Sequence, residues 1–229
     1  MNERLALLAL AALAAAGCGS KAPTTTTTPT TTRTVPVSPA PMALTVFRVR
    51  GGILRPTIVR VPRTRAVAAA ALGALGLAAS IKIAKGTASV GLAKATEAQE
   101  AEIVFTLTQF PTVKRVDVAG RAGLTRQDFQ RYLPPILVES PPAGSTVAST
   151  FHVSGTASVF EATLVVQLVR NGKIIAKRSV MASEGAPGRG PFDSMFHASP
   201  GALTIQAFAP SAVDGSPQHE VAVSVTVMP

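Results

Sequence analysis

The feature that most constrains the fold is an alternation of apolar and mostly polar residues in the second half of the chain. The apolar members of this pattern are Phe151, Val153, Leu164, Val166, Leu168, Val221, Val223, Val225 and Val227. A period of two places successive side chains on opposite faces of an extended chain. The pattern therefore predicts strands that bury one face each.

Turn signals divide this half into short strands. Asn171-Gly172 is typical of a tight β-hairpin and separates two strand-like runs, 163–170 and 173–181. Further runs at 136–139, 190–197 and 202–208 raise the total to about seven strands, which suits an antiparallel sandwich. We expect this sandwich over residues 136–229. It has no cysteine, so its apolar faces alone must hold the two sheets together.

The first half predicts a small α/β domain over residues 42–120, so the overall fold class is α+β. Strands at 44–49 and 53–61 flank Gly51-Gly52 as a hairpin, and Pro56 makes the second run either an edge strand or two pieces joined by a kink. An Ala-rich helix follows at 64–79, with Thr64 as its cap. A membrane-inserted segment is the alternative for this run, but we favour a helix buried against a sheet.

The remaining elements of this domain are two short strands, a helix and a final strand. The strands are expected at 81–83 and 87–92, the helix at 96–109 and the last strand at 113–118. Thr96 and the acidic Glu97, Glu100 and Glu102 suit the N-terminal part of a helix, so we interpret these carboxylates as capping groups and not as catalytic acids. Residues 121–135 are polar, end in Pro134-Pro135 and are interpreted as a linker.

The N-terminal residues are typical of an export signal. A Leu- and Ala-rich run over residues 5–16 precedes small residues and the chain's single cysteine, Cys18. The run is shorter than the roughly 20 residues of a membrane-spanning helix, which is the alternative interpretation. Residues 19–41 are rich in Thr and Pro and predict an extended tether, either a bare spacer or an O-glycosylated stalk.

The motif Ala15-Ala16-Gly17-Cys18 resembles the lipobox of bacterial lipoproteins. The resemblance implies that residues 1–18 form a signal peptide, that a diacylglyceryl group is attached to the Cys18 thiol and that cleavage occurs just before it. Two acyl chains on one cysteine suit stable anchoring, because a single chain binds a membrane only reversibly. We therefore expect attachment to the extracytoplasmic face of the cell membrane.

Positive charge is concentrated in the first half of the chain. Residues 42–135 contain 14 Lys or Arg against five Asp or Glu, whereas residues 136–229 contain five against six. A candidate basic patch comprises Arg48, Arg50, Arg55, Arg60, Arg63 and Arg65. Such a field favours anionic partners. In an exported protein these are lipid headgroups, peptidoglycan or another anionic wall polymer, and we expect no nucleic acid.

Motifs for catalysis and metal binding are absent from the sequence. His152, His197 and His219 fall on separate expected strands without the spacing of zinc ligands. No nucleophile elbow or phosphate loop occurs. We predict no catalytic residue, no metal and no cofactor. A Ser-His-Asp set assembled by the fold is the alternative that stays open.

Two families resemble the two halves. Residues 102–116 (EIVFTLTQFPTVKRV) look like the end of the GerMN domain, the sporulation and spore-germination module, and the hairpin, the Ala-rich helix and residues 86–90 (GTASV) match its earlier parts in order. The resemblance covers about residues 44–120. This sequence lacks the Gly-Pro loop that the family usually carries after its first helix, and it lacks the acidic residue that follows the family's middle strand.

The second half resembles the immunoglobulin-like domain of bacterial spore germination, a usual companion of GerMN. The matching segments are residues 140–145 (SPPAGS), 153–162 (VSGTASVFEA), 190–192 (GPF) and 211–216 (SAVDGS). Together the resemblances imply a non-enzymatic lipoprotein that binds wall polymer or another envelope protein. The alternatives are a cell-wall hydrolase or its accessory subunit, and a module that binds membrane surfaces electrostatically.

Overall fold

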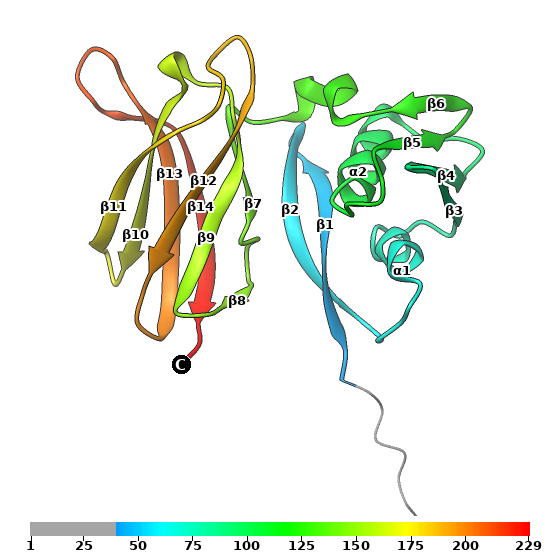
Figure 1. Ribbon diagram of the computed structural model, residues 1–229, viewed down its shortest axis with the longest axis horizontal. Helices are drawn as coiled ribbons and strands as arrows, with labels where there is room; N and C mark the ends of the chain where they lie inside the picture. The colour runs from blue at the N-terminus through cyan, green and yellow to red at the C-terminus, as the bar shows by residue number, and fades with distance from the viewer. Residues whose placement is uncertain (1–39) are drawn as a thin grey trace, which may run out of the picture. The chain divides into compact units, whose positions relative to one another are not determined.

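The computed structural model describes residues 40–229, which belong to one compact unit. The signal peptide expected at 1–18, the lipidation site Cys18 and all but the last two residues of the tether lie outside the described residues. The helices of the described part are each too short or too polar to cross a membrane. Most of this part is β-structure, shown in Figure 1.

The described residues contain two hydrophobic cores. We refer to residues 42–135 as the first lobe and to residues 136–229 as the second lobe. Phe47, Leu72 and Phe105 are fully buried in the core of the first lobe, and Leu164 and Ile205 in that of the second.

The first lobe begins with the predicted hairpin. β1 (Met42–Arg50) pairs antiparallel with β2 (Ile53–Val61), and Gly51 and Gly52 join them with φ of 59° and 77°. Glycine adopts positive φ without steric cost, so the Gly pair suits this turn. Pro56 lies opposite Phe47 in an unbroken β2. The edge-strand alternative is therefore confirmed, since only β1 pairs with β2 in this sheet.

The first helix is shorter than predicted. α1 (Val67–Ala74) starts after Ala66, and the Thr64 hydroxyl accepts a hydrogen bond from the Ala66 amide instead of capping the helix. Gly76 has a φ of 84° just beyond the C-terminus, and the Leu77 amide donates to the Leu72 carbonyl. A glycine in this conformation ends a helix, which is why the Ala-rich run stops early.

A four-stranded sheet completes the first lobe, in the order β3-β4-β5-β6. Its strands are β3 (Ser80–Ala84), β4 (Thr87–Gly91), β5 (Arg115–Val118) and β6 (Arg121–Leu124). β4 and β5 are parallel, and α2 (Glu97–Leu107) connects them. Thr96 caps α2 in a capping box with Gln99, as the sequence predicts for the helix start.

Residues 121–135, which the sequence analysis interprets as a linker, contribute to the core of the first lobe. They contain β6 and the 3₁₀ helix η1 (Arg126–Tyr132). Leu124 and Phe129 are buried in the first core. These two apolar residues stand alone among polar neighbours, so no period of two or 3.6 marks them in the sequence.

The second lobe is a sandwich of two sheets, as predicted. Its strands are β7 (Ile136–Ser140), β8 (Thr146–Val147), β9 (Thr150–Ala157), β10 (Thr163–Arg170), β11 (Lys173–Met181), β12 (Gly190–His197), β13 (Gly201–Pro210) and β14 (Pro217–Val227). One sheet has the order β12-β9-β7, the other β11-β10-β13-β14-β8, and the 3₁₀ helix η2 (Phe160–Ala162) precedes β10. The two-residue β8 was not predicted, and it pairs parallel with β14.

Glycines explain two details of this sandwich, a hairpin turn and a close approach between strands. Asn171 and Gly172 have φ of 50° and 75°, which confirms the predicted hairpin between β10 and β11. Gly155 lies where β9 approaches β7 closely: a Cβ there would lie 1.9 Å from the carbonyl oxygen of Leu137. Only glycine fits at this position.

β7 contributes to both cores. Ile136 and Val138 are buried in the core of the second lobe, whereas Leu137, between them, is buried in the core of the first. The alternation of side chains along a strand explains this division. The first strand of the sandwich is thus buried on both faces.

Candidate functional site

Three of the six arginines predicted as a basic patch lie together at the turn end of the β1–β2 hairpin. Arg48 is directly opposite Arg55, and Arg50 is two residues further along β1 on the same face. The Arg48 guanidinium is half-buried and donates to the carbonyl of Ala74, the last residue of α1. Arg50 and Arg55 are exposed.

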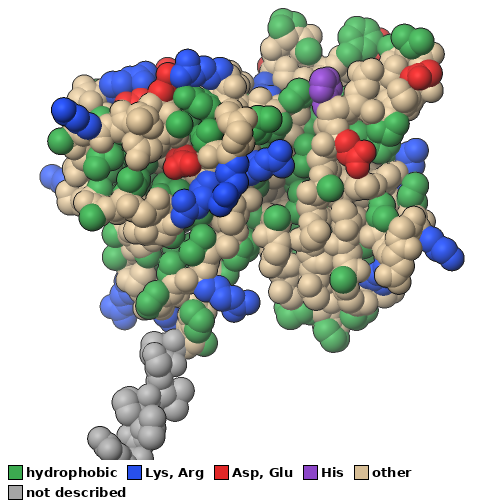
Figure 2. Space-filling model, turned by 180° about the vertical axis from the view of Figure 1, so that it is seen from behind, with side chains coloured by type: hydrophobic (Ala, Val, Ile, Leu, Met, Phe, Trp, Pro, Cys, Tyr) green, Lys and Arg blue, Asp and Glu red, His purple; other side chains and the backbone are tan. Residues whose placement is uncertain are grey.

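The other three arginines lie elsewhere. Arg60 is opposite Ala43, seven residues from Arg50 along β1, which at about 3.4 Å per residue is roughly 24 Å away. Arg63 and Arg65 follow β2 in the connection to α1, and both are exposed. Figure 2 shows Lys and Arg side chains on the viewed face in several separate groups. The structure therefore brings three of the six arginines together.

These arginines have no carboxylate partner within the described residues. The salt bridges there join Arg121 to Glu100, Arg126 to Glu139, Arg131 to Glu97 and His152 to Asp193. Arg48 and Arg55 also face each other as like charges, which is unfavourable across a strand pair. An anionic ligand at the turn end would relieve that repulsion.

A polar cleft of about 870 Å³ opens elsewhere on the first lobe and reaches residues of the second. Its lining includes Thr45, Thr108, Gln109, Thr125, Arg126 and Glu139. The volume falls in the range of small-ligand sites, but such sites are usually more apolar. Hydroxyl and amide groups of this kind suit a ligand with many hydrogen-bonding groups.

Arg126 is held in the cleft by several contacts. Its guanidinium carbon lies 4.7 Å from the centroid of the Phe105 ring and 5.6 Å from that of Phe47. Its Nε donates to the Thr108 hydroxyl at 2.9 Å, and its Nη1 donates to the Glu139 carboxylate at 2.7 Å. Stacking on aromatic rings and hydrogen bonds to a carboxylate together orient the charged group.

Helix α2 covers the open edge of β1 beside this cleft. The Val49 amide donates to Glu102 at 2.7 Å and the Phe47 amide to Thr106 at 2.9 Å, while the Gln109 side chain donates to the Thr45 carbonyl at 2.8 Å. Glu102 and Thr106 lie one turn apart on one face of α2, and Gln109 follows two residues beyond the end of the helix. Their side chains therefore take the place of a neighbouring strand.

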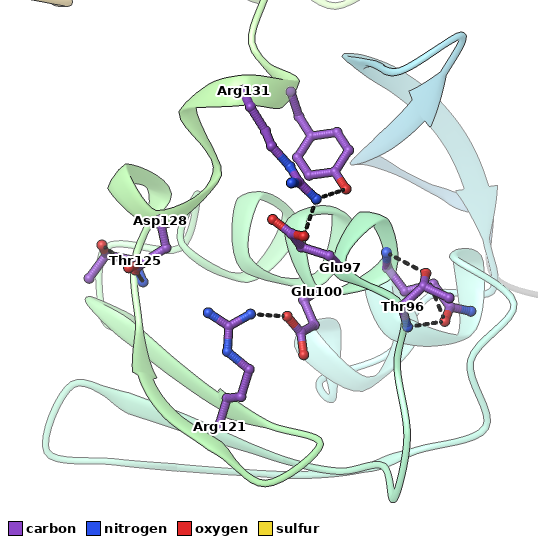
Figure 3. A network of polar contacts seen from close by, with 9 residues as sticks. Thr96, Glu97, Glu100, Arg121, Thr125, Asp128 and Arg131 are labelled. Carbon is purple, nitrogen blue, oxygen red and sulfur yellow. Dashed lines mark hydrogen bonds and ion pairs between the residues drawn. The ribbon is translucent and has the colours of Figure 1, made fainter.

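Ion pairs occupy the other carboxylates of α2, as Figure 3 shows. Glu97 pairs with Arg131, and Glu100, only 5% exposed, pairs with Arg121 at 2.5 Å. Glu97 and Glu100 thus lie in the first turn of α2, as predicted, but Thr96 and Gln99 cap the helix and the two carboxylates pair with arginines. Nearby, hydrogen bonds from the Thr125 amide and hydroxyl lower the pKa of Asp128 below its ordinary 3.8.

The histidines do not assemble a site of their own. His152 Nδ1 lies 2.7 Å from an Asp193 carboxylate oxygen, and His197 Nδ1 lies 3.2 Å from the Thr150 hydroxyl. No hydrogen bond within residues 40–229 joins His152 to a serine. In the same range, no three His, Cys, Asp or Glu side chains gather in a way that could hold a metal ion.

The cleft residues were missed by the sequence analysis. Arg126 lies in the segment interpreted as a linker, and Glu139 lies at the end of the first expected sandwich strand. The two residues are 13 positions apart, and no motif joins them. Only the tertiary packing brings η1, which carries Arg126, close to the end of β7, which carries Glu139.

The fold over residues 136–229 defines the second lobe as an immunoglobulin-like sandwich. Residues 135–216 match the immunoglobulin-like domain of bacterial spore germination. This match confirms that part of the predicted resemblance. None of the curated proteins matches the chain.

Three solved structures share low similarity with the chain. CopC from Methylosinus trichosporium OB3b is 19% identical, with 38% of this chain and 86% of CopC covered and a TM-score of 0.28. An engineered protein is 16% identical, the match covers 59% of this chain and 38% of that protein, and the TM-score is 0.30. Fibronectin(III)-like modules of Clostridium thermocellum CbhA are 18% identical, the match covers 38% of this chain and 88% of the module chain, and the TM-score is 0.24. At these scores the similarities say nothing about function.

Proposed function

We propose that this protein is a lipid-anchored, non-enzymatic binding protein of the cell envelope with a role related to spore germination. The match of residues 135–216 supports the germination-related role. The lipobox-like residues around Cys18 support anchoring on the extracytoplasmic face of the membrane. The proposal that residues 42–120 form a GerMN-like domain rests on the sequence resemblance over residues 44–120.

The single observation that carries the binding function is the group of arginines at the turn end of the β1–β2 hairpin. Arg50 and Arg55 are exposed, share a face with Arg48 and have no carboxylate partner within the described residues. Solvated cations without partners attract polyanions. An anionic wall polymer is the partner that suits an exported protein.

Binding to purified cell walls across a salt series tests this function. Replacing both exposed arginines (Arg50→Glu with Arg55→Glu) should weaken binding by roughly tenfold, or about 1.4 kcal/mol. Wild-type binding should fade as ionic strength rises, because salt screens exposed charges. The matched control is Lys82→Glu with Lys94→Glu, which makes the same charge change at two exposed lysines away from the hairpin.

Other outcomes of this experiment support other functions. Equal weakening by the control pair would mean that net charge, and not the hairpin, drives binding. Tighter binding to vesicles containing anionic lipid than to walls would favour a membrane-surface module. Soluble wall fragments that accumulate with time would favour a hydrolase.

The anchor has its own test. Cells fed a fatty-acid probe should label the wild-type protein, and the Cys18→Ala variant should stay unlabelled and leave the membrane fraction. Equal labelling of both proteins would contradict a lipid on Cys18.

A further inference from the structure

The positive charge of the second lobe is gathered on one hairpin. The lobe has five Lys or Arg and six Asp or Glu, yet four of the five cations are Arg170, Lys173, Lys177 and Arg178. All four lie on β10 and β11, and Arg170 is directly opposite Lys173. No acidic residue lies between positions 163 and 181. The second lobe is therefore nearly neutral in total, but its β10–β11 hairpin is strongly basic.

β11, which carries most of this charge, is an edge strand. It is the terminal member of its sheet and pairs only with β10. Within the described residues, no strand pairs with its outer edge. Such an edge presents unpaired backbone N–H and C=O groups, and natural proteins shorten or cover strands of this kind or guard them with bulges and charged side chains. β11 has a bulge and two lysines, but it is nine residues long and its outer edge pairs with no other strand of the described residues.

Apolar side chains are exposed along the same strand. Ile174 is 56% exposed, Ile175 46% and Met181 72%. The pairing register shifts between Leu168 and Val169, so Ile175 has no direct partner on β10. Exposed isoleucines beside unpaired backbone groups would suit an added strand better than open water.

Two of the cations are positioned by aromatic rings. The Lys177 ammonium lies 5.9 Å from the centroid of the Phe208 ring, and the Arg178 guanidinium carbon lies 5.6 Å from that of Phe196. Lys177 and Arg178 are adjacent in a strand, so they project to opposite faces of the sheet. Positive charge therefore flanks the open edge on both faces.

We propose that the outer edge of β11 binds an extended acidic segment of another protein, which adds to the sheet as a further strand. Backbone hydrogen bonds would supply affinity, the exposed isoleucines would contact apolar side chains, and the flanking cations would select acidic ones. An anionic polysaccharide would satisfy the charges but not the row of backbone groups. This site lies in the second lobe and is independent of the arginines at the β1–β2 turn.

Binding of a synthetic peptide to the purified protein tests this inference. The probe alternates valine and glutamate, is as long as β11 and is blocked at both ends. Lys177→Glu with Arg178→Glu should weaken binding at least tenfold. Lys82→Glu with Lys94→Glu, and separately Arg50→Glu with Arg55→Glu, should leave it within about twofold. Loss of binding in all three double variants would overturn the proposal, because the net charge of the protein and not the edge of β11 would then explain binding.

A second peptide separates strand pairing from charge without altering the protein. N-methylation of alternate residues removes backbone donors from one edge of the peptide and keeps every glutamate. Two methylated peptides are needed, one for each edge. The peptide whose methylated edge faces β11 should bind wild-type protein at least tenfold more weakly than the unmethylated peptide. Unchanged binding of both methylated peptides would overturn strand addition. Equal binding of a soluble anionic polysaccharide, lost in the Lys177/Arg178 variant, would identify a polymer site instead.

Discussion

Arg126 shows how much the surroundings of a single charged residue determine its contribution. Its guanidinium is stacked on Phe105 and bonded to Thr108 and Glu139, with 30% of the side chain exposed. Arg131, five positions later, also pairs with a carboxylate, but 62% of its side chain is exposed. Exposed ion pairs contribute little because water and salt screen them.

We therefore expect Arg126→Gln and Arg131→Gln to differ in their effect on stability. Arg126→Gln should lower the free energy of unfolding by about 2 kcal/mol, because it leaves the half-buried Glu139 without its charged donor. Arg131→Gln should cost much less, because water and salt screen its exposed ion pair. Urea unfolding of both variants measures the difference, and equal losses would contradict this account of the cleft.

Asp128 gives the stability a defined pH dependence. Because hydrogen bonds from Thr125 hold its pKa below 3.8 in the folded protein, the unfolded chain binds a proton more readily. The resulting stabilisation is present above the unfolded pKa and is lost as pH falls through the folded one. Wild type should exceed Asp128→Asn in unfolding free energy at pH 6, and the gap should shrink as the pH falls below about 4. If the difference in unfolding free energy between the two proteins did not change with pH, the Asp128 carboxylate would not be its source.

At the scale of elements, α2 both fills the first core and protects the edge of β1. Its apolar residues Ile103, Val104 and Leu107 are buried, while Glu102 and Thr106, with Gln109 just beyond the helix, bond to the backbone of β1. A hairpin of two strands is marginal by itself and needs such packing. The helix thus supplies what a third strand would supply.

Thr106→Val tests this role of α2. Valine keeps the shape but removes the acceptor of the buried Phe47 amide, and an unsatisfied buried donor costs about 1–3 kcal/mol. Thr226→Val on the exposed face of β14 is the control and should change stability by less than about 0.5 kcal/mol. Amide hydrogen exchange at Phe47 should quicken in Thr106→Val alone.

For the whole molecule, the shared strand β7 links the two cores. Leu137 lies within the segment that matches the immunoglobulin-like domain, yet its side chain is 2% exposed in the core of the first lobe. The core of the first lobe therefore includes a side chain from the second lobe.

Leu137→Ala should accordingly weaken the whole molecule. We expect a loss of about 2–5 kcal/mol, since a fully buried leucine is removed. Ile175→Ala, at a 46% exposed position, should cost much less. Calorimetry should show one transition for the wild type and a lower or divided transition for Leu137→Ala. An unchanged transition in that variant would mean that the lobes are stable independently.

The amino-acid sequence by itself determined the features that depend on neighbouring residues. Gly51-Gly52 and Asn171-Gly172 specify their turns because their backbones accept positive φ, Thr96 specifies the start of α2, and the period of two specifies a half-buried sandwich. Each of these signals acts over a few positions along the chain.

The tertiary structure alone decided which distant residues meet. It buried Leu124 and Phe129 of the expected linker, brought Arg126 to Glu139 and separated Arg60 from the other arginines of the hairpin. It also left one basic strand, β11, at the edge of its sheet. These outcomes depend on packing between elements far apart in sequence, and no local pattern records which faces will meet.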